Sequence, residues 1–268
     1  MLSVPAMSLP DPLAIAAIAL PAAWLFAMTL NRRNVRRYDG SGDPARGTIV
    51  FVEPVRWWFI VWGFTHVARA LRRSGYAGKI RLFRWSNRAG SLLVLPDLMR
   101  RGRLRRKAER LAGFIAKSAA ESCGASVHVV GYSTGCYIAV EACRRADPPL
   151  PVGTLVLLAG TISPRYRLQP LAGRVRRVVN VYSVLDVINW VGPLLFGSND
   201  RRWGPACGAV GFSDPPPFLV QRAWRPADLR VWYWGGHFSV ASPAFLARDI
   251  APYLAVRHDA QRYASGIR

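Results

Sequence analysis

The chain has few cysteines, and their positions exclude several classes of protein. None of the four, Cys123, Cys136, Cys143 and Cys207, is paired as Cys-x-x-Cys, which argues against a zinc ribbon or a dithiol redox site. Four cysteines in 268 residues are also too few for a disulfide framework. We therefore expect reduced thiols, with Cys136 and Cys143 buried on one helix. No motif indicates a metal or a cofactor, and neither is expected.

Acidic residues and lysine are scarce too. Fifteen aspartates and glutamates stand against 37 lysines and arginines, a formal net charge of +22, and only Lys79, Lys107 and Lys117 are lysines. An arginine bias beside 23 glycines and 20 prolines is explained as well by genomic base composition as by an anionic partner. An anionic membrane surface is favoured over nucleic acid, because no nucleic-acid recognition fold or aromatic-basic platform is present.

The basic residues are densest at the start of a predicted helix. They are Arg100, Arg101, Arg103, Arg105, Arg106, Lys107 and Arg110. The run is either a solvated helix face or a contact for anionic headgroups, worth about 1 kcal/mol per well-placed residue.

Long apolar runs are absent, with one exception near the N-terminus. From Leu13 to Leu30 no residue is charged, and as a helix this run would reach about 27 Å, close to the thickness of a bilayer core. Arginines 32, 33, 36 and 37 follow at once, which predicts a single-pass membrane anchor with the rest of the chain in the cytoplasm. A cleaved signal would need a basic stretch before the run, and the sequence has none. A helix packed on the domain is the other alternative.

Beyond this run the sequence predicts one α/β domain. We expect an anchor and basic flank over residues 1–37, a linker over 38–47, the domain over 48–256 and a tail over 257–268. Strands are predicted over 48–52, 79–85, 127–130, 154–158, 178–182 and 229–234, and helices over 57–73, 104–121 and 136–142. Such alternation favours a mostly parallel sheet with helices on both faces.

Ser133 is the most informative residue. It lies in Gly131-Tyr132-Ser133-Thr134-Gly135, between the apolar strand 127–130 and a predicted helix. A Gly-x-Ser-x-Gly turn in this context holds the serine in a strained, exposed conformation, with its hydroxyl within reach of a base. The glycines are small because the strand and the helix close over the turn.

A nucleophilic serine needs a base, and the base needs an orienting carboxylate. His237 follows a Gly-Gly pair after the predicted strand 229–234, where a tight turn would present it at the carboxyl edge of the sheet. Asp186 follows the strand 178–182 and is the favoured acid. The weaker candidates between Ser133 and His237 are Asp200, Asp214 and Asp228, whereas His128 lies inside a strand and is predicted to be core.

These three elements, in this order and each after a strand, resemble the α/β-hydrolase superfamily over roughly residues 46–256. The resemblance implies that Ser133 attacks an acyl carbonyl and that His237 transfers the proton. It implies that Asp186 holds the imidazole in the productive tautomer.

The resemblance also implies an oxyanion hole, with the N–H of Thr134 as one donor. The second donor should come from the loop after the strand 48–52, where the family often has a histidine-glycine pair. This chain has Glu53-Pro54-Val55-Arg56 instead. Proline has no N–H, so Val55 or Arg56 would supply the donor.

Aromatic residues near these loops are candidates for a substrate pocket. They are Tyr132, Trp57, Trp190 and Phe238. The segment Ile188–Arg225 is too long for a simple connection, and it either walls the pocket as a lid or covers the sheet edge. The stretch Trp57–Phe64 is predicted to be a buried helix beside the oxyanion loop, with membrane-interface contact as the alternative.

The predicted function is a membrane-anchored serine hydrolase that cleaves carboxylic ester or thioester bonds of small molecules or acyl lipids. The alternative is a catalytically weak or inactive relative, a tethered module that binds lipids or a partner, and the irregular Glu53-Pro54 loop motivates it. The two differ around Ser133. An enzyme requires the His237 ring within about 4 Å of the serine hydroxyl and an open space above it.

Overall fold

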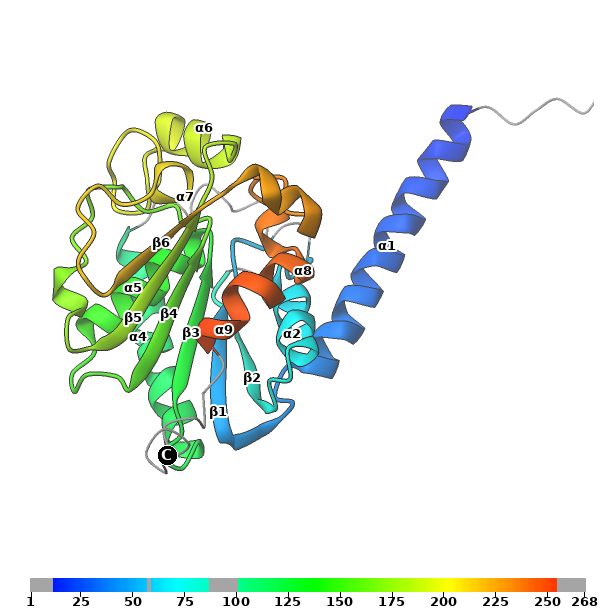
Figure 1. Cartoon of the computed structure of the whole chain (residues 1–268). Coiled ribbons are helices and arrows are strands. Elements are labelled where there is room, and N and C mark those ends of the chain that lie inside the picture. Colours follow the sequence, from blue (N-terminus) through cyan, green and yellow to red (C-terminus); the bar gives the residue numbers. More distant parts are fainter. Residues whose placement is uncertain (1–11, 57–58, 87–100, 255–268) are drawn as a thin grey trace, which may run out of the picture.

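Six parallel strands form the centre of the molecule (Figure 1). The computed structural model describes residues 12–56, 59–86 and 101–254, and within them the strand order is β2-β1-β3-β4-β5-β6. The strands are β1 Asp43–Val52, β2 Gly78–Phe83, β3 Val127–Tyr132, β4 Val152–Leu158, β5 Val175–Tyr182 and β6 Leu219–Ala223. The α/β class and the parallel sheet predicted from the sequence are confirmed.

The register of the strands brings their carboxyl ends to one edge. Val52 pairs with Gly131 across β1 and β3, Gly131 pairs with Leu157 of β4, and Leu158 pairs with Val181 of β5. The loops after β1, β3 and β5 therefore leave the sheet at the same edge, which is where ligands bind in open α/β folds.

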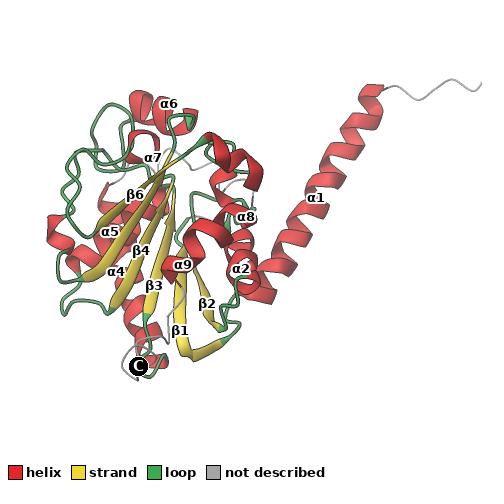
Figure 2. Cartoon of the chain, in the orientation of Figure 1, coloured by secondary structure: helices red, strands yellow, loops and turns green. Residues whose placement is uncertain are grey.

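Helices cover both faces of the sheet (Figure 2). One face carries α4 Arg101–Glu121 and α5 Thr134–Arg145, and the other carries α2 Phe64–Arg73. The short helical segments Pro243–Phe245, Leu246–Ile250 and Ala251–Leu254 lie on the same face as α2.

The side chains of β1 alternate between the two faces of the sheet, and apolar residues on both faces explain why helices cover both. Val50 and Val52 belong to the core under α4 and α5, whereas Ile49 and Phe51 belong to the core under α2. All four are fully buried, since successive side chains of a strand point to opposite faces. Burial of each such side chain contributes about 1.5–3 kcal/mol.

The N-terminal helix α1 spans Pro12–Tyr38 and extends away from the domain at its outer end (Figure 1). Its inner end docks on the domain, where Val35 is buried and the Asn31 amide forms two 3.1 Å hydrogen bonds with the backbone of Val61. Among the helices in the described residues, none combines the length and apolar character that crossing a membrane requires. The predicted transmembrane helix is therefore not supported.

The predicted strand 229–234 is wrong, and β6 at Leu219–Ala223 takes its place at the sheet edge. A 3₁₀ helix occupies Pro226–Val231 instead, with proline at its start and the Asp228 carboxylate bonded to the N–H of Arg225. Trp232 then adopts a left-handed conformation that ends any extended run. The β-forming residues of this segment are overridden by the ion pairs of Asp228 described below.

Two further boundaries differ from the sequence predictions. The predicted linker 38–47 overlaps β1, because Asp43 already pairs with Gly78 of β2. The predicted helix over 57–73 begins only at Phe64, since Phe59 (φ 68°) and Gly63 (φ 80°) have positive φ angles that interrupt a helix. The predicted burial of the Trp57–Phe64 stretch fails at Phe59, which is exposed, while Trp57 and Trp58 lie outside the described residues.

Candidate active site

Ser133 occupies the turn between β3 and α5 in a strained conformation. Its φ of 53° and ψ of −124° lie where non-glycine residues are rare, at a typical cost of about 1–3 kcal/mol. Its N–H donates to the carbonyl of Leu158 at 2.9 Å, and its own carbonyl accepts from Cys136 at 3.0 Å. These two backbone bonds hold the turn between β4 and α5.

Both glycines of the motif are required by close backbone contacts. A Cβ at Gly131 would lie 2.8 Å from the Cα of Cys136, so α5 could not pack against β3. A Cβ at Gly135 would lie 2.5 Å from the carbonyl oxygen of Val52 and 2.6 Å from that of Glu53. Gly135 therefore lets the loop after β1 approach the serine turn.

The three residues predicted as a catalytic set lie together in one chain of hydrogen bonds. His237 Nε2 is 3.1 Å from Ser133 Oγ, and His237 Nδ1 is 2.9 Å from Asp186 Oδ2. Ser133 and His237 are 8% exposed and Asp186 is 1% exposed, so this chain is largely shielded from water. These distances suit transfer of the serine proton to the imidazole.

The other aspartates that the sequence left open bind elsewhere. Asp200 accepts from Ser163 and Ser198, Asp214 accepts from Gln169, and Asp228 pairs with Arg222 and Arg248. Those contacts are structural. The last of them fixes the 3₁₀ helix that leads toward His237.

His237 reaches the site from a loop rather than from the end of a strand. Gly235, with a φ of 79°, supplies the tight turn that was predicted before it. The Tyr132 hydroxyl donates to the His237 carbonyl at 2.7 Å, and its ring lies 5.8 Å from the imidazole. Burial raises the pKa of Tyr132 well above its ordinary value, so the hydroxyl stays a donor.

Asn189 is a site residue that the sequence did not reveal. Its side-chain amide donates to Asp186 Oδ2 at 2.7 Å and to the carbonyl of Ala159 at 3.0 Å. Its backbone N–H donates to Asp186 Oδ1 at 3.1 Å, which caps α6, the helix Val187–Phe196. The available signal was the spacing Asp186-x-x-Asn189, since an aspartate before a helix caps the N–H three residues later.

A cavity of about 560 Å³ opens in front of Ser133. Its walls come from α1, the loop after β1, the serine turn, α6 and the His237 loop, and its apolar lining includes Trp24, Ile60, Trp62, Ile188, Pro193 and Phe196. The segment Ile188–Arg225 thus contributes both a pocket wall, through α6, and the edge strand β6.

The predicted pocket residues divide between cavity and surface. Tyr132 and Phe238 line the cavity. Trp190 does not, because it projects from the other side of α6 and its indole N–H donates to the carbonyl of Val184 at 3.0 Å. Trp57 lies outside the described residues.

The two candidates for the second oxyanion donor, Val55 and Arg56, lie on different sides of the loop after β1. Val55 lines the cavity together with Ser133 and Thr134, and Thr134 is the first residue of α5, where helix N–H groups lack intrahelical acceptors. The side chain of Arg56 turns away and pairs with Glu53 at 3.2 Å. Of the two residues that the sequence proposed for the second donor, Val55 is the one at the cavity.

Glu53 anchors this loop. Its Oε1 accepts from the Trp85 N–H at 3.1 Å, from the Ser86 N–H at 3.2 Å and from the Ser86 hydroxyl at 2.9 Å. Burial raises the pKa of Glu53, and the neighbouring charge of Arg56 opposes that effect. Glu53, which departs from the family's histidine-glycine pair, therefore connects the loop after β1 to the residues that follow β2.

Among the described residues, neither His128 nor a cysteine lines the cavity in front of Ser133. His128 is buried in β3 as predicted, and burial lowers its pKa to about 4. Cys136, Cys143 and Cys207 are buried free thiols, and Cys123 is an exposed free thiol. Within the part of the chain that the structure describes, no three His, Cys, Asp or Glu residues are placed to hold a metal ion.

Comparisons with known proteins find likeness in structure alone. No protein-family model matches the chain, and no curated protein matches it in sequence. A lipase from Bacillus licheniformis is 12% identical, with a TM-score of 0.49, and the match covers 81% of this chain and 96% of the lipase. A carboxylesterase from Bacillus subtilis is 12% identical, with a TM-score of 0.43, covering 87% of this chain and 98% of that one.

A third solved structure, an α/β serine hydrolase without a lid from Xanthomonas campestris, is 14% identical. Its TM-score is 0.39, and the match covers 86% of this chain and 87% of that protein. All three TM-scores are below 0.5, so these likenesses carry no argument about this chain, and the α/β fold follows from its own six-stranded parallel sheet.

Proposed function

We propose that the protein is a serine hydrolase that cleaves carboxylic ester or thioester bonds. The observation that carries this proposal is the hydrogen-bonded chain from Asp186 through His237 to Ser133, at the wall of an open apolar cavity. The close imidazole and the open space above the serine support an enzyme over a binding module.

In the proposed reaction, Ser133 Oγ attacks the acyl carbonyl carbon while His237 Nε2 takes the hydroxyl proton. The tetrahedral intermediate collapses, the alcohol or thiol leaves with that proton, and an acyl-serine remains. Water then attacks the acyl carbonyl carbon as its proton passes to His237, and His237 returns that proton to Ser133 Oγ as the acyl–oxygen bond breaks and the acid is released. Asp186 keeps the Nδ1 proton in place and stabilises the imidazolium in both steps.

The negative charge that develops on the carbonyl oxygen needs donors fixed in advance. The N–H of Thr134 at the start of α5 is the first, and the N–H of Val55 is the proposed second. Gly135 and Glu53 support this arrangement, because one permits the close approach of the loop and the other anchors it.

A fluorophosphonate probe tests the proposed nucleophile. Ser133 Oγ should displace the fluoride, so the wild-type protein becomes labelled and Ser133→Ala does not. Ser213→Ala, which removes the hydroxyl of an exposed serine, should label like wild type. Folded wild-type protein that stays unlabelled would favour the alternative, a module that binds without catalysis.

The cavity supports an apolar acyl group as the part of the substrate that binds beside Ser133. Its walls are mainly aliphatic and aromatic, with polar groups confined to the residues around the serine and to Thr161 and Asn199. Burial of each methylene of an acyl chain would contribute about 0.8 kcal/mol. Small-molecule esters with extended acyl chains, and acyl lipids among them, are therefore the proposed substrates.

Gly192 of α6 offers a test of this acyl site, because it lines the cavity and has open space around its Cα. Gly192→Leu should narrow the cavity and lower kcat/KM for a dodecanoyl ester by ~10-fold relative to an acetyl ester. Val191→Leu changes the neighbouring residue, which is exposed and outside the cavity, and should leave the ratio unchanged. An unchanged ratio in Gly192→Leu would place the acyl chain elsewhere.

Membrane attachment through α1, with the domain in the cytoplasm, is the proposed localisation of this hydrolase. Leu20, Leu25 and Phe26 are exposed on the part of α1 that extends from the domain, and arginines follow them. Trp24 on the same helix lines the active-site cavity. Attachment there would bring the cavity close to lipid.

Fractionation of cells that express the full chain tests the localisation. The wild-type protein should sediment with the membrane pellet, and Leu25→Glu/Phe26→Glu should shift protein to the supernatant, because charges on the apolar part of α1 oppose its transfer into lipid. Recovery of wild type in the soluble fraction would contradict attachment.

A further inference from the structure

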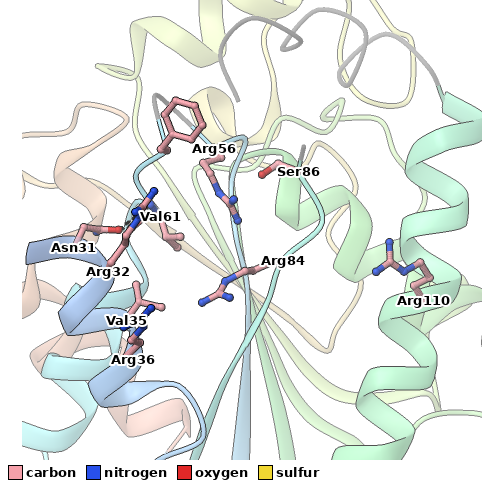
Figure 3. Close-up of a pocket in the computed structure, with 10 residues that line it drawn as sticks. Asn31, Arg32, Val35, Arg36, Arg56, Val61, Arg84, Ser86 and Arg110 are labelled. Carbon is pink, nitrogen blue, oxygen red and sulfur yellow. Dashed lines mark hydrogen bonds between the residues drawn. The ribbon is translucent and has the colours of Figure 1, made fainter. Parts of the chain in front are cut away.

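A second cavity, of about 700 Å³, lies next to the loop that follows β1 (Figure 3). Arg56, Phe59 and Val61 line it, whereas Val55, Ile60 and Trp62 of the same loop line the cavity that contains Ser133. The loop therefore separates two cavities of different character. We call the second one the arginine cavity.

Among the described residues, five arginines line the arginine cavity, and they come from four separate parts of the chain. Arg32 and Arg36 lie on α1, Arg56 lies after β1, Arg84 lies after β2 and Arg110 lies on α4. In Figure 3 the α1 and α4 arginines lie on opposite sides, with Arg84 between them and Arg56 above it. A solvated face of one helix would not produce this convergence.

The positive charge of this cavity is only partly neutralised. Glu53 pairs with Arg56 at 3.2 Å, and Asp39 lies 3.7 Å from Arg84. Arg32, Arg36 and Arg110 have no ion pair with a carboxylate in the described residues. Two negative charges thus offset two of the five guanidinium groups. The remaining three repel one another across a shared space, so a bound anion would lower the free energy of the site.

We propose that the arginine cavity binds a ligand that carries a phosphate monoester or a polyphosphate group. Guanidinium groups donate in pairs to phosphate oxygens, and an excess of three charges suits a multiply charged anion better than a single carboxylate. Phe59, Val61 and Val35 give the cavity an apolar wall for the carbon part of such a ligand. A soluble phosphate ester and a phosphorylated lipid headgroup share this chemistry.

The proposal does not depend on hydrolase activity. A ligand in the arginine cavity would contact the loop after β1 from the side opposite Ser133. Arg56 would be the shared element, since it lines this cavity and bonds to Glu53, the residue that anchors the loop.

Calorimetric titration of the full chain with inorganic pyrophosphate, at constant ionic strength, tests the proposal. Arg32→Gln/Arg36→Gln should weaken binding by at least ~10-fold, since charge-assisted hydrogen bonds contribute about 1.5–3 kcal/mol each. Arg33→Gln/Arg37→Gln removes the same charge from the same helix outside the cavity, and should weaken binding far less. Arg84→Gln, from another wall, is the second variant in case the first does not fold.

A parallel titration uses phosphatidylcholine vesicles with and without phosphatidic acid. Binding of pyrophosphate that depends on the cavity arginines identifies a soluble phosphate ligand. Cavity-dependent binding confined to the phosphatidic acid vesicles identifies a lipid headgroup, and both results uphold the site. The proposal would be overturned if neither pyrophosphate nor the phosphatidic acid vesicles bound saturably. It would also be overturned if the cavity variants and the Arg33→Gln/Arg37→Gln control lost affinity equally.

Discussion

The close approach of the β1 loop to the serine turn is the constraint on which the rest of the site depends. It exists because position 135 has no side chain, so the carbonyl oxygens of Val52 and Glu53 can lie against the start of α5. That contact places Val55 at the same cavity as Ser133 and Thr134. The strained backbone of Ser133 is tolerated because β3, β4 and α5 hold the turn from both sides.

The same loop explains how apolar and cationic binding surfaces coexist at one end of the sheet. Residues on alternate sides of it face different cavities, one beside Ser133 and one lined by arginines. Glu53 holds the loop in place through Ser86, Trp85 and Arg56. The proposed acyl site and the proposed anion site therefore share one structural support.

Sequence reasoning succeeded where local chemistry decides the structure. The strand, turn and helix around Ser133 follow from a short motif, and Asp186 follows β5 as predicted, whereas no strand precedes His237. Sequence-based prediction failed where contacts between distant residues determine the local structure. The segment 229–234 has strand-forming residues, but a 3₁₀ helix over Pro226–Val231, where Asp228 pairs with Arg222 and Arg248, occupies its first half. The contact of Asn189 with Asp186 had a local signal in their spacing, whereas the meeting of arginines from four segments had none, because it arises from tertiary contacts.

Replacement of Gly135 by alanine tests the central constraint most directly, with Gly113→Ala as its matched control. Gly113 lies in α4 with open space around it, so alanine there should stabilise the fold by about 0.5–1 kcal/mol. Alanine at position 135 meets backbone oxygens and should cost about 1–3 kcal/mol of stability. Ester hydrolysis, measured where both variants are folded, should be lost in Gly135→Ala and retained in Gly113→Ala. Equal activity in the two would contradict the account.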